Sequence, residues 1–299
     1  MKSALALMIV LWMVALGGCA SDELFLDPEP PVEVEVDPDW SPDGATIAYT
    51  HSLDEVWLLD LQTTERRFLT KGMWPVWSPE GKRIAYVKAN DVHVIEVETE
   101  EITRLTDWGE CYFPSWSPDG TRICYDVIAV PADSLGLWIM NSDGSGKTRV
   151  VRGRAPDWSP DGATLAYVGG PGSAARTESQ IWLVRTDGTE ETQLTERAVA
   201  NRYPCWSPDG ARIAWNSFGS RNDSSNGIWI MNADGTNQRK VVRDGSFGGR
   251  PSWSPDGERI VYPGHNKDSD TVTLWIVNAD GTDARPLTRP EDYGTPGGT

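Results

Sequence analysis

The chain has 299 residues, of which 39% are hydrophobic, and a formal net charge of −17 at pH 7. This length accommodates one large domain or two small ones. So strong a negative charge disfavours nucleic acid and anionic membrane surfaces as partners.

The first eighteen residues read as a secretory signal peptide, because the basic Lys2 precedes an apolar run over 4–16. The sequence Leu16-Gly17-Gly18-Cys19 then resembles a bacterial lipobox. That resemblance implies cleavage before Cys19, a lipid on its thiol, and a place outside the cytoplasm in the cell envelope. An apolar run this short spans a bilayer poorly. Ala20, rather than aspartate, follows the cysteine, which by resemblance to enterobacterial sorting favours the outer membrane.

Residues 19–36 form an acidic, proline-containing tether. Fully extended, such a segment reaches roughly 55 Å, so the anchored body stays near its membrane. Valine and glutamate alternate over 32–36. This alternation fits either an edge strand that helps to close the next domain or a solvated linker.

A seven-residue motif, Pro-x-Trp-Ser-Pro-Asp/Glu-Gly, recurs six times over the body at 37–288. Its tryptophans are Trp40, Trp77, Trp116, Trp158, Trp206 and Trp253. They are 37 to 48 residues apart. A period near forty with short strands between turns is typical of propellers and solenoids.

Each copy predicts four strands. The first ends on the repeated tryptophan, and Ser-Pro-Asp-Gly forms a tight turn. The second strand, such as 46–49 or 122–125, alternates large and small residues, and the third, such as 56–59 or 137–140, is apolar. A short fourth strand often ends on Leu-Thr. Four-stranded repeats are propeller blades, so we predict an all-β, six-bladed β-propeller with four-stranded antiparallel blades, followed by a tail at 289–299.

These repeats resemble the WD40-like propeller repeats of the TolB family. The resemblance covers residues 37–288 and implies the fold more firmly than a function. It also implies a platform that binds a partner protein at the channel mouth. Only the tether precedes the first blade, where TolB has an α/β domain, so we expect a TolB-like propeller rather than TolB.

Catalytic and metal sites are poorly supported by the residues. The six acidic turn residues, such as Asp43 and Glu80, are explained by turn chemistry and stand on separate blades. The chain has three histidines and no Gly-x-Ser-x-Gly motif. We therefore expect no cofactor, no metal and no enzymatic activity. A channel-centred binder of small ligands or glycans, or a lyase-type enzyme on a propeller, is the alternative, and a purely structural envelope element is a third possibility.

Three cysteines remain in the body: Cys111, Cys124 and Cys205. Cys124 takes a place that alanine fills in other copies, such as Ala85 and Ala166, which indicates a core position. Cys111 and Cys124 lie on one predicted hairpin, but in an offset register. Free buried thiols are therefore favoured over a bridge between them.

Residues just before each Pro-x-Trp are expected to line the channel mouth, where the loops between strands four and one gather. The candidate partner-binding residues are Arg154, Arg202, Arg250, Trp74, Phe113 and Tyr203. Arginine and aromatic side chains together are typical of protein-binding hot spots. Alternatively, the arginines pair with nearby acidic residues and only seal the channel. The long loops 168–180 and 216–227 are predicted on the same face.

The sequence therefore predicts a monomeric envelope lipoprotein that binds another envelope protein through its loop-bearing face. The arginines are expected to hold an acidic segment or a terminal carboxylate, with the aromatic side chains in apolar contact.

Overall fold

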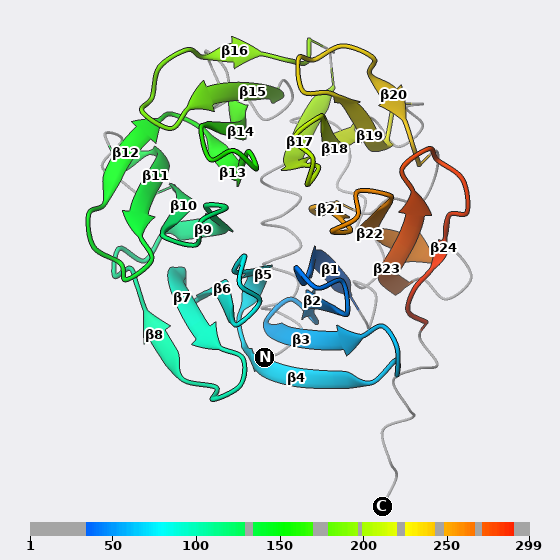
Figure 1. Ribbon diagram of the computed structural model, residues 1–299, viewed down its shortest axis with the longest axis horizontal. Helices are drawn as coiled ribbons and strands as arrows, with labels where there is room; N and C mark the ends of the chain where they lie inside the picture. The colour runs from blue at the N-terminus through cyan, green and yellow to red at the C-terminus, as the bar shows by residue number, and fades with distance from the viewer. Residues whose placement is uncertain are drawn as a thin grey trace, which may run out of the picture.

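The computed structural model describes residues 34–128, 134–169, 179–196, 199–219, 225–242, 248–266 and 271–289. Six antiparallel four-stranded sheets surround a central axis (Figure 1). The predicted six-bladed β-propeller is confirmed. Cys19, the signal peptide and most of the tether lie outside the described residues. Within the described part of the chain, no helix has the length and hydropathy needed to cross a membrane.

Each blade consists of four consecutive strands, the first of them nearest the axis (Figure 1). Blades 1 and 2 contain β1 (Glu35–Trp40), β2 (Thr46–His51), β3 (Glu55–Asp60), β4 (Arg66–Lys71), β5 (Met73–Trp77), β6 (Arg83–Lys88), β7 (Asp91–Glu96) and β8 (Ile102–Arg104). Blades 3 and 4 contain β9 (Cys111–Trp116), β10 (Arg122–Val127), β11 (Gly136–Asn141), β12 (Thr148–Val151), β13 (Arg154–Trp158), β14 (Thr164–Gly169), β15 (Gln180–Arg185) and β16 (Thr192–Gln193). Blades 5 and 6 contain β17 (Ala200–Trp206), β18 (Arg212–Phe218), β19 (Gly227–Asn232), β20 (Arg239–Lys240), β21 (Ser252–Trp253), β22 (Arg259–Asn266), β23 (Thr271–Asn278) and β24 (Arg285–Pro286).

The Ser-Pro-Asp-Gly turn is built by its own side chains. In blade 1 the Ser41 hydroxyl donates to Asp43 Oδ1 at 2.6 Å, and the same oxygen accepts the backbone N–H of Ala45 at 3.0 Å. Gly44 has φ +75°, a conformation that glycine adopts without strain. The serine hydrogen bond holds the pKa of Asp43 below its usual value. The turn carboxylates are therefore structural, as the sequence indicates.

The core lies between adjacent blades. Ile47 and Tyr49 of β2 pack against blade 6, whereas Ala48 on the opposite face packs against Ile84 and Tyr86 of blade 2. All five side chains are fully buried. The alternation of large and small residues in the second strand thus lets the large face of one blade rest on the small face of another. Full burial of one such large side chain contributes about 1.5–3 kcal/mol.

Hydrogen bonds link consecutive blades close to the axis. The residue between proline and tryptophan in one motif accepts the backbone N–H of the tryptophan in the next motif. The four such bonds join Trp77 N to Asp39 Oδ2 (2.7 Å), Trp158 N to Ser115 Oγ (3.4 Å), Trp206 N to Asp157 Oδ2 (2.8 Å) and Trp40 N to Ser252 Oγ (3.2 Å). The last bond connects blade 6 to blade 1. Val76 and Cys205 hold the equivalent places in the other two blades.

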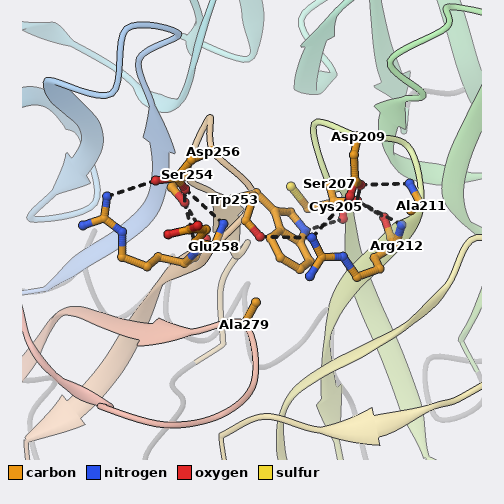
Figure 2. Close-up of polar contacts among 12 residues, drawn as sticks. Cys205, Ser207, Asp209, Ala211, Arg212, Trp253, Ser254, Asp256, Glu258 and Ala279 are labelled. Atoms are coloured by element: carbon orange, nitrogen blue, oxygen red, sulfur yellow. Dashed lines mark hydrogen bonds and ion pairs between the residues drawn. The ribbon is translucent and has the colours of Figure 1, made fainter.

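Cation–π contacts link the same blades farther from the axis. The arginine that begins a second strand lies over the motif tryptophan of the following blade, as Arg212 does over Trp253 at 4.6 Å. Figure 2 shows this junction between blades 5 and 6, where the Trp253 indole also donates to the Cys205 carbonyl at 3.2 Å. The other pairs are Arg83–Trp116, Arg122–Trp158 and Arg259–Trp40.

The segment before the first motif belongs to the propeller. Val34 forms a parallel bridge with Val272 of blade 6, and Val34 and Val36 are both buried. The fully buried Glu35 accepts the backbone N–H of Leu274 at 3.1 Å and lies 3.4 Å from Arg66 Nη1. Of the two interpretations of this segment, its described residues fit the one in which it helps to close the ring.

Replacing Arg122 by alanine should lower the free energy of unfolding by about 0.5–2 kcal/mol, the usual range for a cation–π contact. The loss arises because the Arg122 guanidinium lies 4.7 Å from the centre of the Trp158 ring across a blade junction. Chemical denaturation followed by tryptophan fluorescence measures it. Arg185→Ala, at an exposed arginine with a 4.0 Å ion pair, is the control and should change little. Equal effects of the two substitutions would contradict the role of the stacked arginines.

Candidate functional site

The innermost strands bend at the channel mouth. In five blades the residue before the motif proline has a positive φ of 47–55°: Asp37, Trp74, Phe113, Ala155 and Tyr203. The strand register shifts at each of these positions, which marks a β-bulge. A residue before proline normally takes an extended conformation, so this backbone is strained. Bulges redirect side chains, and strain of this kind is concentrated at functional positions.

Three of the redirected side chains form an aromatic row across blades 2, 3 and 5. The Trp74 and Phe113 rings have centroids 4.6 Å apart, and those of Phe113 and Tyr203 are 5.6 Å apart. Phe218 extends the row at 6.5 Å from Tyr203. Trp74 is buried, while Phe113 and Tyr203 are half-buried and keep some surface at the mouth. Burial raises the pKa of the Tyr203 hydroxyl to about 12, so it is uncharged at neutral pH.

A narrow space lies beside this row. Phe113, Ala155, Tyr203 and Arg250, with two motif prolines, enclose a space too narrow for a water molecule.

Arg250 differs from the prediction that placed it at the mouth to grip a partner. Only 11% of its side chain is exposed, and its guanidinium donates to Asp157 Oδ1 and to the Pro114 carbonyl. The reason is a concentration of acidic groups on the axis, where Asp37 and Asp39 also contribute favourable charge interactions with Arg250. Arg250 thus has the pairing with an acidic residue that the alternative expected.

The three axial aspartates share one guanidinium. Burial is the main cause that raises the pKa of Asp37 and of Asp39 to about 6, and it also raises the pKa of Asp157. Arg250 opposes the shift in all three cases. One cation for three carboxylates leaves an excess of buried negative charge at neutral pH, which is unfavourable.

Arg154 and Arg202 lie at the mouth on blades 4 and 5. The Arg154 side chain is 34% exposed, and its Nε lies 3.9 Å from Oδ2 of the buried Asp126. Within the described residues, no hydrogen bond engages its two terminal nitrogens. Arg202 lies 5.7 Å from the centre of the Phe218 ring and donates to the Ser179 hydroxyl at 3.4 Å. The fork of Arg154 is thus suited to bind a carboxylate.

Asp126 was not among the predicted site residues. It follows the core tyrosine of the second strand, a place held by Thr50, Val87, Val168, Asn216 and Pro263 in the other blades. Asp126 is the carboxylate among the six residues at this repeated position, and this difference between the copies is the sequence signal that could have identified it. Asp39 and Asp157, between the motif proline and tryptophan, were missed in the same way.

The three cysteines of the body are free and buried, as favoured. Cys111 pairs in register with Val127 and Cys124 with Ser115, so the two thiols are offset along the hairpin. In the part of the chain that the structure describes, no three His, Cys, Asp or Glu side chains gather as metal ligands. Most of the two predicted mouth loops, at 170–178 and 220–224, lies outside the described residues.

A second hollow lies between blades 5 and 6 near the turns drawn in Figure 2. It is a shallow groove of about 520 Å³ lined by Arg212, Arg239 and several acidic residues. Arg212 stacks on Trp253 and donates to the Gly257 carbonyl at 3.0 Å, and Arg239 donates to the Ala279 carbonyl at 2.6 Å. Both arginines are thus engaged in contacts that stabilise the fold, so the channel mouth is the stronger candidate for a binding site.

Comparisons with known proteins agree with this architecture. Residues 127–297 match a family model described as the TolB beta propeller domain, and residues 51–115 match one described as the N-terminal region of dipeptidyl peptidase IV. None of the curated proteins compared matches the chain.

Among solved structures, a TolB-type protein from Agrobacterium tumefaciens is similar, with 22% identity and a TM-score of 0.66 over 82% of this chain and 90% of that one. TolB from Acinetobacter baumannii has 18% identity and a TM-score of 0.67 over 94% and 68% of the two chains. An oligogalacturonate lyase from Vibrio parahaemolyticus has 18% identity and a TM-score of 0.58 over 87% and 80%. At such identities the likeness concerns the fold.

The stability of the folded chain should increase when the pH falls from 7.5 to 5. Asp37 and Asp39 have a pKa of about 6 in the folded state, against an ordinary value near 3.8. Folding therefore favours their protonated forms. The stability that these two groups contribute is present at low pH and is lost as the pH rises from about 3.8 to about 6. Below about pH 4 the turn aspartates act oppositely, since hydrogen bonds lower their pKa, to about 2 for Asp119. Thermal unfolding at a series of pH values should thus show a maximum near pH 4, where the two opposing effects balance.

Asp39→Asn should reduce this difference by raising the unfolding temperature at pH 7.5, because it removes one uncompensated buried charge. Glu98→Gln, at an exposed carboxylate, is the matched control. If the decline between pH 5 and 7.5 is the same in Asp39→Asn and in the unchanged chain, the axial aspartates are not its cause.

Proposed function

The chain belongs to the TolB beta propeller domain family, whose model matches residues 127–297, and from this premise we propose that it binds a protein partner at the channel mouth. The partner is another protein of the cell envelope that presents an acidic segment or a terminal carboxylate. Arg154 and Arg202 hold the negative groups, and Phe113 and Tyr203 provide apolar contact.

The observation that carries this proposal is the state of Arg154. It is a partly exposed arginine whose terminal nitrogens have no hydrogen-bond acceptor among the described residues, beside a half-buried aromatic row. Partly desolvated arginine next to rigid aromatic surface is the composition of binding hot spots. A fixed aromatic row also lowers the entropy lost on association, because its side chains are already ordered.

Arg250 is not part of the proposed site, and Trp74 contributes mainly from beneath it. Arg250 is engaged on the axis, and Trp74 is 9% exposed, where it supports Phe113. In this proposal the protein acts by binding its partner and catalyses no reaction. The likeness to an oligogalacturonate lyase concerns the fold and does not assign a reaction to this chain.

We further propose that the chain works outside the cytoplasm, held to a membrane by a lipid on Cys19. Its family membership and its likeness to TolB structures support an envelope location, and the lipobox-like sequence supports the anchor. Two or more acyl chains hold a protein stably at a membrane. The acidic tether then keeps the propeller close to that surface without attraction to anionic headgroups.

Arg154→Glu combined with Arg202→Glu should abolish capture of the partner from the native envelope. Reversal of interfacial charges costs on the order of 2–5 kcal/mol, which is more than a tenfold loss of affinity. Quantitative mass spectrometry of proteins co-purified with each variant measures the loss. Arg149→Glu with Arg185→Glu, at exposed positions of blades 3 and 4, makes the same charge change away from the mouth. Equal recovery of every partner by both double variants would show that the mouth is not the interface.

Cys19→Ala should move the protein from the membrane fraction to the aqueous fraction after cell breakage. The substitution removes the thiol that carries the lipid in the proposed anchor. Immunoblotting of the separated fractions provides the measurement, and Ser21→Ala, two residues further along, is the control. Membrane retention of the Cys19 variant would disprove the lipid anchor without affecting the mouth proposal.

A further inference from the structure

Asp126 is buried next to the partly exposed Arg154. It lies on β10, opposite Tyr112 of β9 and Leu137 of β11, and has no exposed surface. Its Oδ2 accepts the backbone N–H of Ala155 at 3.3 Å. Its Oδ1 is buried and has no hydrogen-bond partner among the described residues. A carboxylate in this position is poorly stabilised by hydrogen bonds and depends on a nearby positive charge.

The positive charge that acts on Asp126 comes from Arg154. The other titratable groups around it are Cys111 and Tyr112 of β9, Cys124 of β10, Asp157 of β13 and Tyr203 of β17. The thiols and phenols are neutral at pH 7, because burial raises the pKa of each. Asp157 is paired with Arg250, and β11 carries no titratable residue.

We propose that binding of an anionic group to Arg154 is coupled to the uptake of one proton by Asp126. This inference rests on the proposed function, since it concerns the same arginine. The ligand class is a carboxylate of an acidic peptide, and the proton comes from solvent. No covalent bond changes other than the new O–H bond, and Oδ1 receives the proton because Oδ2 already accepts from Ala155.

The physical reason is competition for one guanidinium. A ligand carboxylate on Arg154 neutralises the charge that stabilises ionised Asp126 and adds a like charge nearby, so both effects favour the protonated form. Burial already raises the pKa of Asp126 to about 7, so a further increase moves protons at physiological pH. Linkage is reciprocal, and protonated Asp126 therefore leaves Arg154 free to bind its ligand more tightly.

The coupling predicts that affinity falls as the pH rises above 7. Each unit by which the pKa of Asp126 increases on binding corresponds to about a tenfold change in affinity across the transition. We therefore expect binding about tenfold tighter at pH 6 than at pH 8. The sign follows from proton uptake, because a reaction that consumes a proton is favoured at low pH.

The first experiment requires no ligand. The side-chain carboxyl carbon of Asp126 is titrated by NMR in the whole folded chain and in Arg154→Gln, with the signal identified by its loss in Asp126→Asn. Removal of the guanidinium imitates its capture by a ligand and should raise the titration midpoint by about one pH unit or more. An unchanged midpoint would overturn the coupling, whatever the natural partner is.

The second experiment measures binding of a synthetic hexa-aspartate peptide at pH 6 and pH 8 by calorimetry. The unchanged chain and Asp107→Asn, an exposed control on the loop before β9, should bind about tenfold more tightly at pH 6. Asp126→Asn imitates the protonated state and should bind equally at both values. Peptide binding with the same affinity at both pH values in the unchanged chain overturns the coupling but leaves the proposed function intact. Absence of binding at both values counts against the proposed function, and the NMR titration then decides the coupling alone.

Discussion

The hydrogen bond that four of the six motif tryptophans make to the preceding blade is the contact on which the geometry of the ring depends. The backbone N–H groups of Trp77 and Trp206 lie in partly buried surroundings near the axis, where Asp39 and Asp157 of the blade before accept them. Because an unpaired buried N–H is costly, each such bond fixes the distance and angle between two blades. The bulges, the aromatic row and the mouth arginines all lie a few residues before this point in the chain, so their positions depend on the same constraint.

The carboxylates that accept these hydrogen bonds also need a nearby positive charge to stabilise their ionised forms. Asp39 and Asp157 are partly buried near the buried Asp37, and the long side chain of Arg250 reaches Asp157 and acts on all three carboxylates. The fold thereby uses an arginine that would otherwise be available at the surface. Arg154 has a similar neighbour in Asp126, but at 3.9 Å and with a third of its side chain exposed. The two arginines thus differ in exposure and in the distance to their carboxylates, and this difference is why the proposed site includes Arg154 and leaves out Arg250.

The repeat made the fold predictable, because one turn motif and one alternating strand recur in six copies and every copy obeys the same local rules. The site was predicted less completely. Residues around the axis come from different blades, so Arg250 meets an aspartate 93 positions away, and no local pattern reports that distance. Asp126 looked like an ordinary strand residue because its importance depends on burial, which only the packing of blades 3 and 4 determines. The aromatic residues were identified because they precede the motif directly, although their contact with one another was not foreseen.

Among the described residues no strand is exchanged between the first and last blades, since β1–β4 and β21–β24 form separate four-stranded sheets. Their junction has both the axial hydrogen bond to Trp40 and the cation–π contact of Arg259, with the Val34–Val272 bridge and Glu35 added. The order of the blades around the ring therefore does not depend on which two blades contain the ends of the chain. A chain cut between any two blades and rejoined elsewhere would retain every four-stranded sheet whole.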